Sequence, residues 1–337
     1  MTAVLGERLE SAYPAYLRCL DEADENAAID LALDLLDNGV APEDVLLSLV
    51  APAQAQVGEW WQRNEWSVAQ EHAATHISER VVAAVASTVR RKPSRDRVVV
   101  ACMDGEWHSL PARLVAEVLR LDGWEVTFLG ASVPAVHLVS YLHRHDLRAV
   151  ALACSLPMRL PHAARFVDAC RRTDVPVLVG GRGFGPGGRW AARLGVPWVP
   201  DARAASVALA AMSLPAPATP AGVGDTDVEY AGLLAARVEL IDLCVAGIPD
   251  VARYTPAQLD ATIADLGYIV DSLAAAVYVD DVTLFADFTT WLGEVLGSRN
   301  VPLRTVDAAF DLMAERLRDF PRAFRFLRGT RLAPEGS

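Results

Sequence analysis

A glutamate and a histidine stand two residues apart in a segment that could hold a metal ion. The stretch DGEWHSLPARL follows an apolar run and places Glu106 and His108 just before a helical pattern. A carboxylate that accepts a hydrogen bond from one imidazole nitrogen fixes the tautomer of the ring and leaves the other nitrogen free to bind a metal. A lone loop histidine is more often a plain surface residue, so the residues after the other apolar runs decide between the two interpretations.

Small and polar residues follow two of these other runs. Ser155 and Leu156 come after the run that starts at 149, and the pair Gly180 and Gly181 ends the run that starts at 176. Each alone is typical of a helix cap or a turn. Ligands bind at the carboxyl ends of parallel strands, where small residues leave room for a long ligand. A serine hydroxyl at such a position can form a hydrogen bond with a nitrogen atom of that ligand.

The elements that must position these residues follow from the pattern of the whole chain. Five short β-branched runs alternate with helical stretches, namely RVVVACM, WEVTFLG, AVALACS, PVLVGG and PWVP. This alternation predicts a doubly wound, flavodoxin-like α/β domain with a five-stranded parallel sheet. Apolar spacing of three and four residues predicts helices on both sides of it. The multidomain chain is thus expected to hold a four-helix bundle, the α/β domain, a Pro/Gly/Ala-rich linker and an all-α domain, at 1–92, 95–212, 213–227 and 228–330.

A second group of residues with possible chemistry lies in the predicted bundle. In WQRNEWSVAQEH, Trp61 precedes the adjacent pair Glu71 and His72 by ten positions. Ser67 and Gln70 have the spacing of a capping box, so a new helix is predicted to start there and to fold back beside the helix of Trp61. The three side chains are then expected to converge on one spot.

Simpler interpretations exist for each of these signals. Trp61 could be an ordinary core residue and Glu71 a favourable first-turn acid. His72 and His76 lie one turn apart and could bind a metal, but the sequence offers no third ligand nearby. The stretch GFGPGG matches a dinucleotide-binding pattern, yet it follows the fourth predicted strand rather than the first.

Residues 95–212 resemble the cobalamin-binding domain of corrinoid methyltransferases, mutases and light-responsive cobalamin repressors. The family pattern Asp-x-His-x-x-Gly stands here as Glu106-Trp107-His108-Ser109-Leu110-Pro111. The glutamate matches the light-responsive branch, and the proline departs from the pattern. The resemblance implies that His108 binds the cobalt ion and that the remaining cofactor contacts come from Glu106, Ser109, Ser155, Leu156, Gly180 and Gly181.

The bundle sharpens this resemblance. Trp-x9-Glu-His immediately before a cobalamin domain is similar to the motif of adenosylcobalamin photoreceptors. It implies that Trp61 stacks over the upper axial adenosyl group, with Glu71 and His72 against it. The expected function is a light sensor with adenosylcobalamin as cofactor, and not an enzyme. Two alternatives stay open, a corrinoid methyl-carrier protein of a methyltransferase system and a scaffold that has lost the ligand.

The C-terminal domain resembles the globin-like, heme-free bilin-binding domain of the photocobilins. All seven histidines precede residue 163, so a globin-like fold here has no imidazole for heme iron. The resemblance implies biliverdin or another linear tetrapyrrole. On one expected helix, Tyr268, Asp271, Tyr278 and Asp281 share roughly one face, which could be either a bilin site or a solvated face with tyrosines in the core.

Composition predicts what the chain does not contact. The net charge is −12, and RRKPSR at 90–95 is the one short basic run, which predicts no nucleic-acid partner. No helix-turn-helix pattern precedes the bundle. A charged start and the absence of a long apolar run predict a cytoplasmic protein without a membrane partner. Five scattered cysteines are typical of reduced thiols. We expect a homo-oligomer, and the downstream signalling partner is left open.

Overall fold

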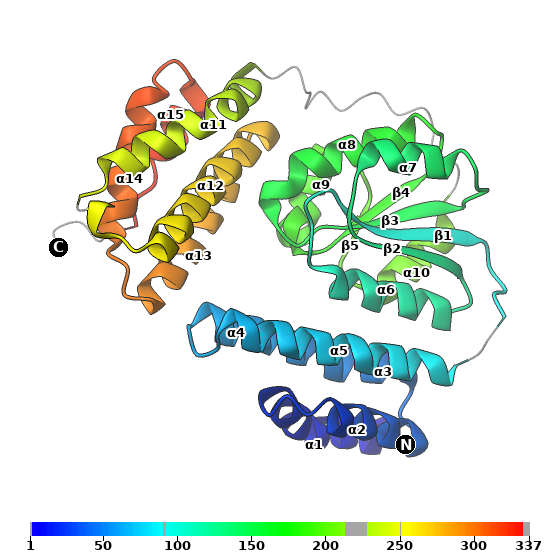
Figure 1. Cartoon of the computed structure of the whole chain (residues 1–337). Helices are drawn as coiled ribbons and strands as arrows, with labels where there is room; N and C mark the ends of the chain where they lie inside the picture. The colour runs from blue at the N-terminus through cyan, green and yellow to red at the C-terminus, as the bar shows by residue number, and fades with distance from the viewer. Residues whose placement is uncertain (1, 90–91, 213–227, 250, 333–337) are drawn as a thin grey trace. The chain divides into compact units, whose positions relative to one another are not determined.

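A computed structural model describes residues 2–89, 92–212, 228–249 and 251–332 (Figure 1). The predicted linker at 213–227 lies outside the described residues. The chain divides into two compact units. The first unit consists of residues 1–153, 166–181 and 197–216, and the second of residues 154–165, 182–196 and 217–337.

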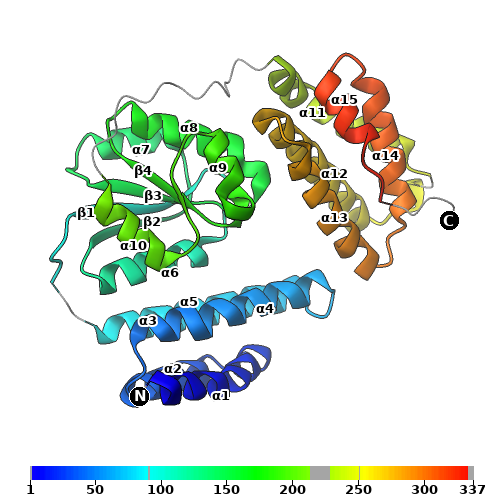
Figure 2. The same cartoon turned by 180° about the vertical axis from the view of Figure 1, so that it is seen from behind.

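The N-terminal region of the first unit is the predicted four-helix bundle. One of its helices is continuous but changes to π-helix in the middle. The bundle consists of α1 (Thr2–Asp21), α2 (Glu25–Asp37), the continuous segment of α3 (Pro42–Val45), η1 (Leu46–Val50) and α4 (Ala51–Gln62), and α5 (Val68–Thr88). Both views show α5 side by side with α4 (Figures 1 and 2).

The α/β region has the predicted parallel sheet, in the order β2-β1-β3-β4-β5. This order is that of the flavodoxin-like doubly wound class, so the prediction is confirmed. The strands are β1 (Arg97–Met103), β2 (Glu125–Val133), β3 (Ala149–Ala153), β4 (Val177–Gly180) and β5 (Trp198–Val199). The helices are α6 (Ser109–Leu121), α7 (Ala135–Leu142), α8 (Leu160–Arg171), α9 (Arg189–Arg193) and α10 (Ala202–Ala211).

The bundle and the α/β region share a hydrophobic core within the first unit. Leu110, Leu114 and Val118 of α6 are buried together with the bundle core, which includes Leu46 and Leu49. Apolar surface on one face of α6 is thereby removed from water by the bundle, and this burial is the main force that holds the two regions together. The opposite face of α6 covers the sheet.

Polar contacts supplement this shared core. The guanidinium group of Arg203, at the start of α10, forms ion pairs with Glu43 and Asp44 near the start of α3. The Ser109 hydroxyl donates to a carboxylate oxygen of Glu79 on α5 at 3.4 Å. Directional interactions therefore link the α/β region to α3 and to α5 of the bundle.

The C-terminal domain is all-helical, as predicted. Its helices are α11 (Val228–Gly247), α12 (Pro256–Val279), α13 (Val282–Ser298), α14 (Leu303–Arg316) and α15 (Pro321–Arg328), with a short 3₁₀ turn η5 (Val251–Arg253). By length and composition, α12 is the one helix of the described chain that could span a membrane. Its apolar window is 67% buried, which is the pattern of a helix at the centre of a helical domain.

Candidate functional site

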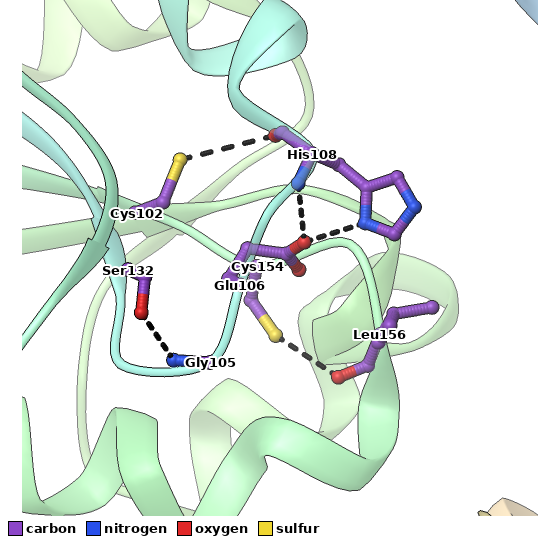
Figure 3. A network of polar contacts seen from close by, with 7 residues as sticks. All are labelled: Cys102, Gly105, Glu106, His108, Ser132, Cys154 and Leu156. Carbon is purple, nitrogen blue, oxygen red and sulfur yellow. Dashed lines mark hydrogen bonds and ion pairs between the residues drawn. The ribbon is translucent and has the colours of Figure 1, made fainter. Parts of the chain in front are cut away.

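The loop after β1 holds its histidine by a buried carboxylate. The Glu106 side chain is 0% exposed, and one of its oxygens lies 2.6 Å from Nδ1 of His108. The backbone N–H of His108 donates to the same oxygen at 3.0 Å. A neutral imidazole that donates a hydrogen bond from Nδ1 to this carboxylate carries its lone pair on Nε2, and Figure 3 shows Nε2 facing away from Glu106.

The exposure of the His108 ring leaves it accessible to a metal ion. The His108 side chain is 52% exposed although its carboxylate partner is fully buried. A buried carboxylate is tolerated only where hydrogen bonds compensate its lost hydration, and His108 supplies two of them. The pair therefore presents an oriented imidazole that can bind a metal ion.

The end of β2 fixes the path of this loop. Gly105 adopts φ +76°, and its N–H donates to the Ser132 hydroxyl at 3.1 Å (Figure 3). The N–H of Ser132 donates in turn to the carbonyl oxygen of Glu106 at 2.9 Å. Ser132 is a positioning residue that the sequence did not reveal, because nothing in the pattern of the β2 segment shows that it meets the loop after β1.

The predicted small residues do lie at the carboxyl ends of the strands. Gly180 ends β4 in register with Ala153, the last residue of β3. Gly181 follows with φ +100°, a conformation that favours glycine. The backbone at these strand ends thus stays free of bulky side chains, as the binding of a long ligand requires.

The loop after β3 is closely packed against the glycine-rich segment. Ser155 and Leu156 are half-buried, and the Cys154 thiol donates to the carbonyl oxygen of Leu156 at 3.3 Å (Figure 3). A Cβ on Gly183 would lie 2.5 Å from Sγ of Cys154, so this position requires glycine. The GFGPGG stretch therefore serves close backbone packing here. It forms two 3₁₀ turns, η3 (Arg182–Phe184) and η4 (Pro186–Gly188).

The helical hairpin of the bundle places the second group as the capping signal predicted. The Ser67 hydroxyl and the Gln70 side chain form the capping box of α5. Trp61 lies in the last turn of α4 and is half-buried, and Glu71 lies in the first turns of α5. Both residues are thus within about one turn of the same loop. Glu71 and His72 come together, with Oε2 and Nε2 3.4 Å apart.

Contacts with bundle residues clarify two further predictions, one for His76 and one for Ser109. Nε2 of His76 lies 3.9 Å from a carboxylate oxygen of Glu25. The described residues contain no group of three or more metal-ligating side chains, so the alternative of a metal site at His72 and His76 has no support there. Ser109 contacts Glu79 of the bundle. Its hydroxyl is therefore engaged between the two regions of the first unit.

The three residues predicted for a bilin have different environments. Tyr268 is 44% exposed. The Asp271 carboxylate accepts two hydrogen bonds from Arg237, at 2.7 and 3.2 Å. Tyr278 is buried in the core, where its ring meets the edge of Tyr230 at 4.9 Å between centroids.

The prediction that Asp281 shares a helix face with these residues is wrong. Helix α12 ends at Val279, and Asp280 turns the chain with φ +49°. Asp281 instead caps α13 by accepting a hydrogen bond from the N–H of Thr283 at 3.0 Å. The helical spacing holds only up to Val279, because Asp280 adopts a left-handed conformation in which the chain reverses before Asp281.

Comparison with known proteins defines the class. Two family models, each described as a B12 binding domain, match residues 14–86 and 96–209. They cover the bundle and the α/β region, that is, both groups of candidate residues in the first part of the chain. The chain therefore contains B12-binding domains, and cobalamin is the ligand class of the site.

Particular relatives are consistent with this class. The HTH-type transcriptional repressor CarA of Myxococcus xanthus is 27% identical over 180 residues, which are 52% of this chain and 59% of the repressor. CarH of the same organism is 36% identical over 110 residues, 31% of this chain and 36% of the repressor. The chain thus spans less than two thirds of either relative. The monomethylamine corrinoid protein of Methanosarcina barkeri shares the fold, with a TM-score of 0.52 at 17% identity over 60% of this chain and 99% of that one.

These relatives correct one prediction. The acidic composition predicted no nucleic-acid partner, but both curated relatives are HTH-type transcriptional repressors, a class that binds DNA. The prediction is contradicted. Its physical weakness is that a net charge of −12 is a sum over the whole chain, whereas recognition of nucleic acid depends on local charge.

Proposed function

We propose that this protein is a light sensor that binds adenosylcobalamin, with His108 as the lower cobalt ligand and Trp61, Glu71 and His72 over the upper face. It would act as a sensor and not as an enzyme. The observation that carries the proposal is the buried Glu106 carboxylate at 2.6 Å from Nδ1 of His108, which leaves Nε2 as the coordinating atom. The likeness to light-responsive repressors in sequence motif supports the choice of the adenosyl form.

The residues present at the site are chemically suited to hold adenosylcobalamin. Glu106 orients the imidazole and increases its basicity as a ligand. The glycines at the end of β4 and the open strand ends leave room for a nucleotide tail. The aromatic ring of Trp61, half-buried beside the α4–α5 loop, offers a surface on which a purine can stack.

When bound, adenosylcobalamin supplies a cobalt–carbon bond that visible light breaks. The chain's own part is to hold bundle and α/β region in one arrangement in the dark and in another afterwards. The contacts that must change lie between α5 and α6, where Glu79 meets Ser109. The ion pairs between Arg203 and the start of α3 can stay in place during this change.

The test is the absorption spectrum of the purified protein with adenosylcobalamin and, separately, with methylcobalamin, each in the dark and after illumination. A light sensor should take up adenosylcobalamin with an imidazole-bound spectrum in the dark and change elution volume after light. Preferential binding of methylcobalamin, with methyl transfer to a thiol or amine acceptor, would instead support the methyl-carrier alternative. No uptake of either form would support the scaffold.

For residues 228–330 we propose biliverdin or another linear tetrapyrrole as ligand. The guanidinium group of Arg237 lies over Gly267, where a Cβ would come within 2.7 Å of Nη2, and it pairs with Asp271. Tyr268 is exposed beside Gly267 in the chain. An arginine held in a fixed direction is a suitable partner for a propionate carboxylate, and the adjacent phenol can donate to a pyrrole carbonyl.

This second ligand is tested on the whole protein with biliverdin and, separately, with hemin. A sharpened, red-shifted bilin band that responds to light is expected, and it should weaken in Arg237→Leu. Arg316→Leu is the matched control, because Arg316 of α14 forms an exposed ion pair with Glu239, which lies on α11, the helix of Arg237. A stoichiometric Soret band with hemin and no bilin uptake would refute this assignment.

A further inference from the structure

A chain of hydrogen bonds leads from the helix α4 to Glu71. The Gln54 amide nitrogen donates to the Thr75 hydroxyl at 2.6 Å, and that hydroxyl donates to Oε1 of Glu71 at 2.9 Å. The Thr75 hydroxyl has one proton, and this proton goes to the carboxylate, so the hydroxyl must accept from Gln54. The orientation of the Gln54 amide is therefore fixed, with its NH₂ toward Thr75 and its carbonyl oxygen away from it.

The carbonyl oxygen of Gln54 is a buried acceptor without a partner. Its Oε1 atom is buried and has no hydrogen-bond partner among the residues that the structure describes. Buried polar atoms are nearly always paired, and an unpaired one destabilises the free protein. An acceptor kept in this state inside a ligand-binding region indicates that the donor arrives with the ligand.

The position of Gln54 places this acceptor beside the upper group of residues. Gln54, Gly58 and Trp61 follow each other at four and three residues, so they lie on one face of α4. Gly58 is exposed, and a Cβ there would meet no atom within 4 Å, so the helix surface between Gln54 and Trp61 is open; we call this open space the notch. An acceptor, a notch and an aromatic ring thus follow one another along the helix.

The partner helix shows which way this cluster faces. Glu71, Thr75 and Glu79 follow at four-residue intervals and share one face of α5. Glu79 contacts Ser109, the neighbour of His108 in the chain. The Gln54–Thr75–Glu71 chain therefore lies on the face of the bundle that turns toward the start of α6 and the histidine loop.

We propose that Gln54 selects the upper axial ligand. Its buried carbonyl oxygen accepts a hydrogen bond from a hydroxyl or amino group of an adenosyl ligand that enters the notch at Gly58. Its amide, acting through Thr75, holds the Glu71 carboxylate in place. A methyl ligand has no hydrogen-bond donor, and the proton of a hydroxo ligand lies on the oxygen bound to cobalt, too far from Gln54 to reach it. Gln54 therefore favours the nucleoside form. The inference rests on the proposed binding of adenosylcobalamin and adds the residue that decides the preference.

The experiment measures dark affinities for adenosyl-, methyl- and hydroxocobalamin by equilibrium dialysis, together with the melting temperature of the free protein. Gln54→Leu should weaken adenosylcobalamin by about tenfold, the value of one hydrogen bond in a buried site, and leave the other two forms within about twofold. The melting temperature of the free variant should stay close to that of the wild type, because the loss of the hydrogen bond from Gln54 to Thr75 is offset by the removal of an unpaired buried acceptor. Gln56→Leu, two residues further on α4 and turned to another side, is the control.

Gly58→Ala separates ligand contact from folding. Alanine is a better helix former than glycine and its Cβ meets no atom here, so the free protein should melt at a higher temperature. Because the methyl group fills part of the notch, adenosylcobalamin should bind several-fold more weakly, on the order of fivefold, while hydroxocobalamin is unaffected. A structural role for Gly58 predicts the opposite combination, a lower melting temperature and no change in selectivity.

The outcomes distinguish this inference from the function on which it rests. If the wild type binds adenosyl- and methylcobalamin equally well, the proposed function fails. If the wild type prefers adenosylcobalamin and Gln54→Leu keeps the whole preference, the role of Gln54 is overturned while the proposed function stands. Equal losses for all three cobalamins with a lower melting temperature would also overturn it, since they mark a residue needed only for folding.

Discussion

The two candidate faces of the cobalamin site are built in different ways. On the α/β side, His108 is held by a fully buried carboxylate through its ring and its backbone. On the bundle side, the His72 side chain is 75% exposed, and its Nε2 lies 3.4 Å from a carboxylate oxygen of Glu71. The first group is preorganised by the end of a sheet, and the second stands on a helical hairpin.

Under the proposed function, this difference assigns retention of the cofactor to the α/β side and the response to light to the bundle side. A rigid lower ligand retains the cofactor whatever occupies its upper face. A bundle whose candidate residue His72 is largely exposed would change position at a small cost in free energy when the upper ligand changes. Variants of the lower side, such as those of His108 and Glu106, should therefore weaken the binding of all cobalamins. Variants of the upper side, such as those of Trp61, should weaken the binding of adenosylcobalamin alone.

The largest effect is expected for His108→Ala. This variant lacks the imidazole ligand, so the cobalt bands should shift to those of a water- or base-bound form for every cobalamin. The loss of affinity should exceed the roughly 10–100-fold that follows removal of an outer-shell partner. Absorption spectra and equilibrium dialysis check it, with the exposed His137→Ala of α7 as control. Unchanged bands in His108→Ala would remove His108 from the site.

A smaller effect of the same kind is expected for Glu106→Gln. The amide can still accept from Nδ1, but it no longer stabilises the imidazole by its charge, so affinity for all cobalamins should fall by about tenfold. Titrations with hydroxo- and adenosylcobalamin measure this loss. Glu59→Gln on the exposed surface of α4 is the control. A loss confined to adenosylcobalamin would contradict the assignment of Glu106 to the lower side.

Trp61→Ala should act on one cobalamin only. Stacking of a base on an aromatic side chain contributes about 1–3 kcal/mol, and it is present only when the adenosyl group is bound. The ratio of adenosyl- to hydroxocobalamin affinity should therefore fall by about tenfold in dark binding assays. Trp60→Ala is the matched control, because Trp60 packs on Trp66 with centroids 4.7 Å apart. That control should lower the melting temperature and leave the ratio unchanged. Equal losses for both cobalamins in Trp61→Ala would make Trp61 a core residue.

The smallest effect on the site is expected for Cys102→Ala, which should bind cobalamin like the wild type. Burial, with a smaller contribution from the Glu106 carboxylate, raises the pKa of the Cys102 thiol to about 12. The unfolded chain loses this proton above about pH 9, so the folded protein holds more protons and its free energy of unfolding falls as the pH rises further. Each such thiol contributes about 1.4 kcal/mol per pH unit in that window.

Denaturant unfolding between pH 8 and pH 11, measured for wild type and Cys102→Ala, checks this sign. The variant should lose stability less steeply above pH 9. Burial also raises the pKa of Cys170 and Cys244 to about 12, so a slope should persist in the single variant. A parallel pair of curves would mean that the Cys102 thiol is open to solvent in the folded protein.

Local sequence by itself determined the elements of the first unit. The β-branched runs became the strands, because alternation of short apolar runs with helical stretches depends on neighbours only a few residues away. The capping box of Ser67 and Gln70 is equally local, and it correctly placed Glu71 and His72 in the first turns of α5. The contact between Glu106 and His108 spans two residues, so it too could be predicted from the sequence.

Only the tertiary structure decided the contacts between distant segments. Ser132 supports the loop of Glu106 from the end of another strand, and Gln54 reaches Thr75 from a different helix. Asp281 does not lie on the predicted helix face, because Asp280 adopts a left-handed conformation and redirects the chain after α12. Such contacts depend on how helices and strands pack, and packing is set by the summed burial of many apolar side chains rather than by the spacing of a few residues.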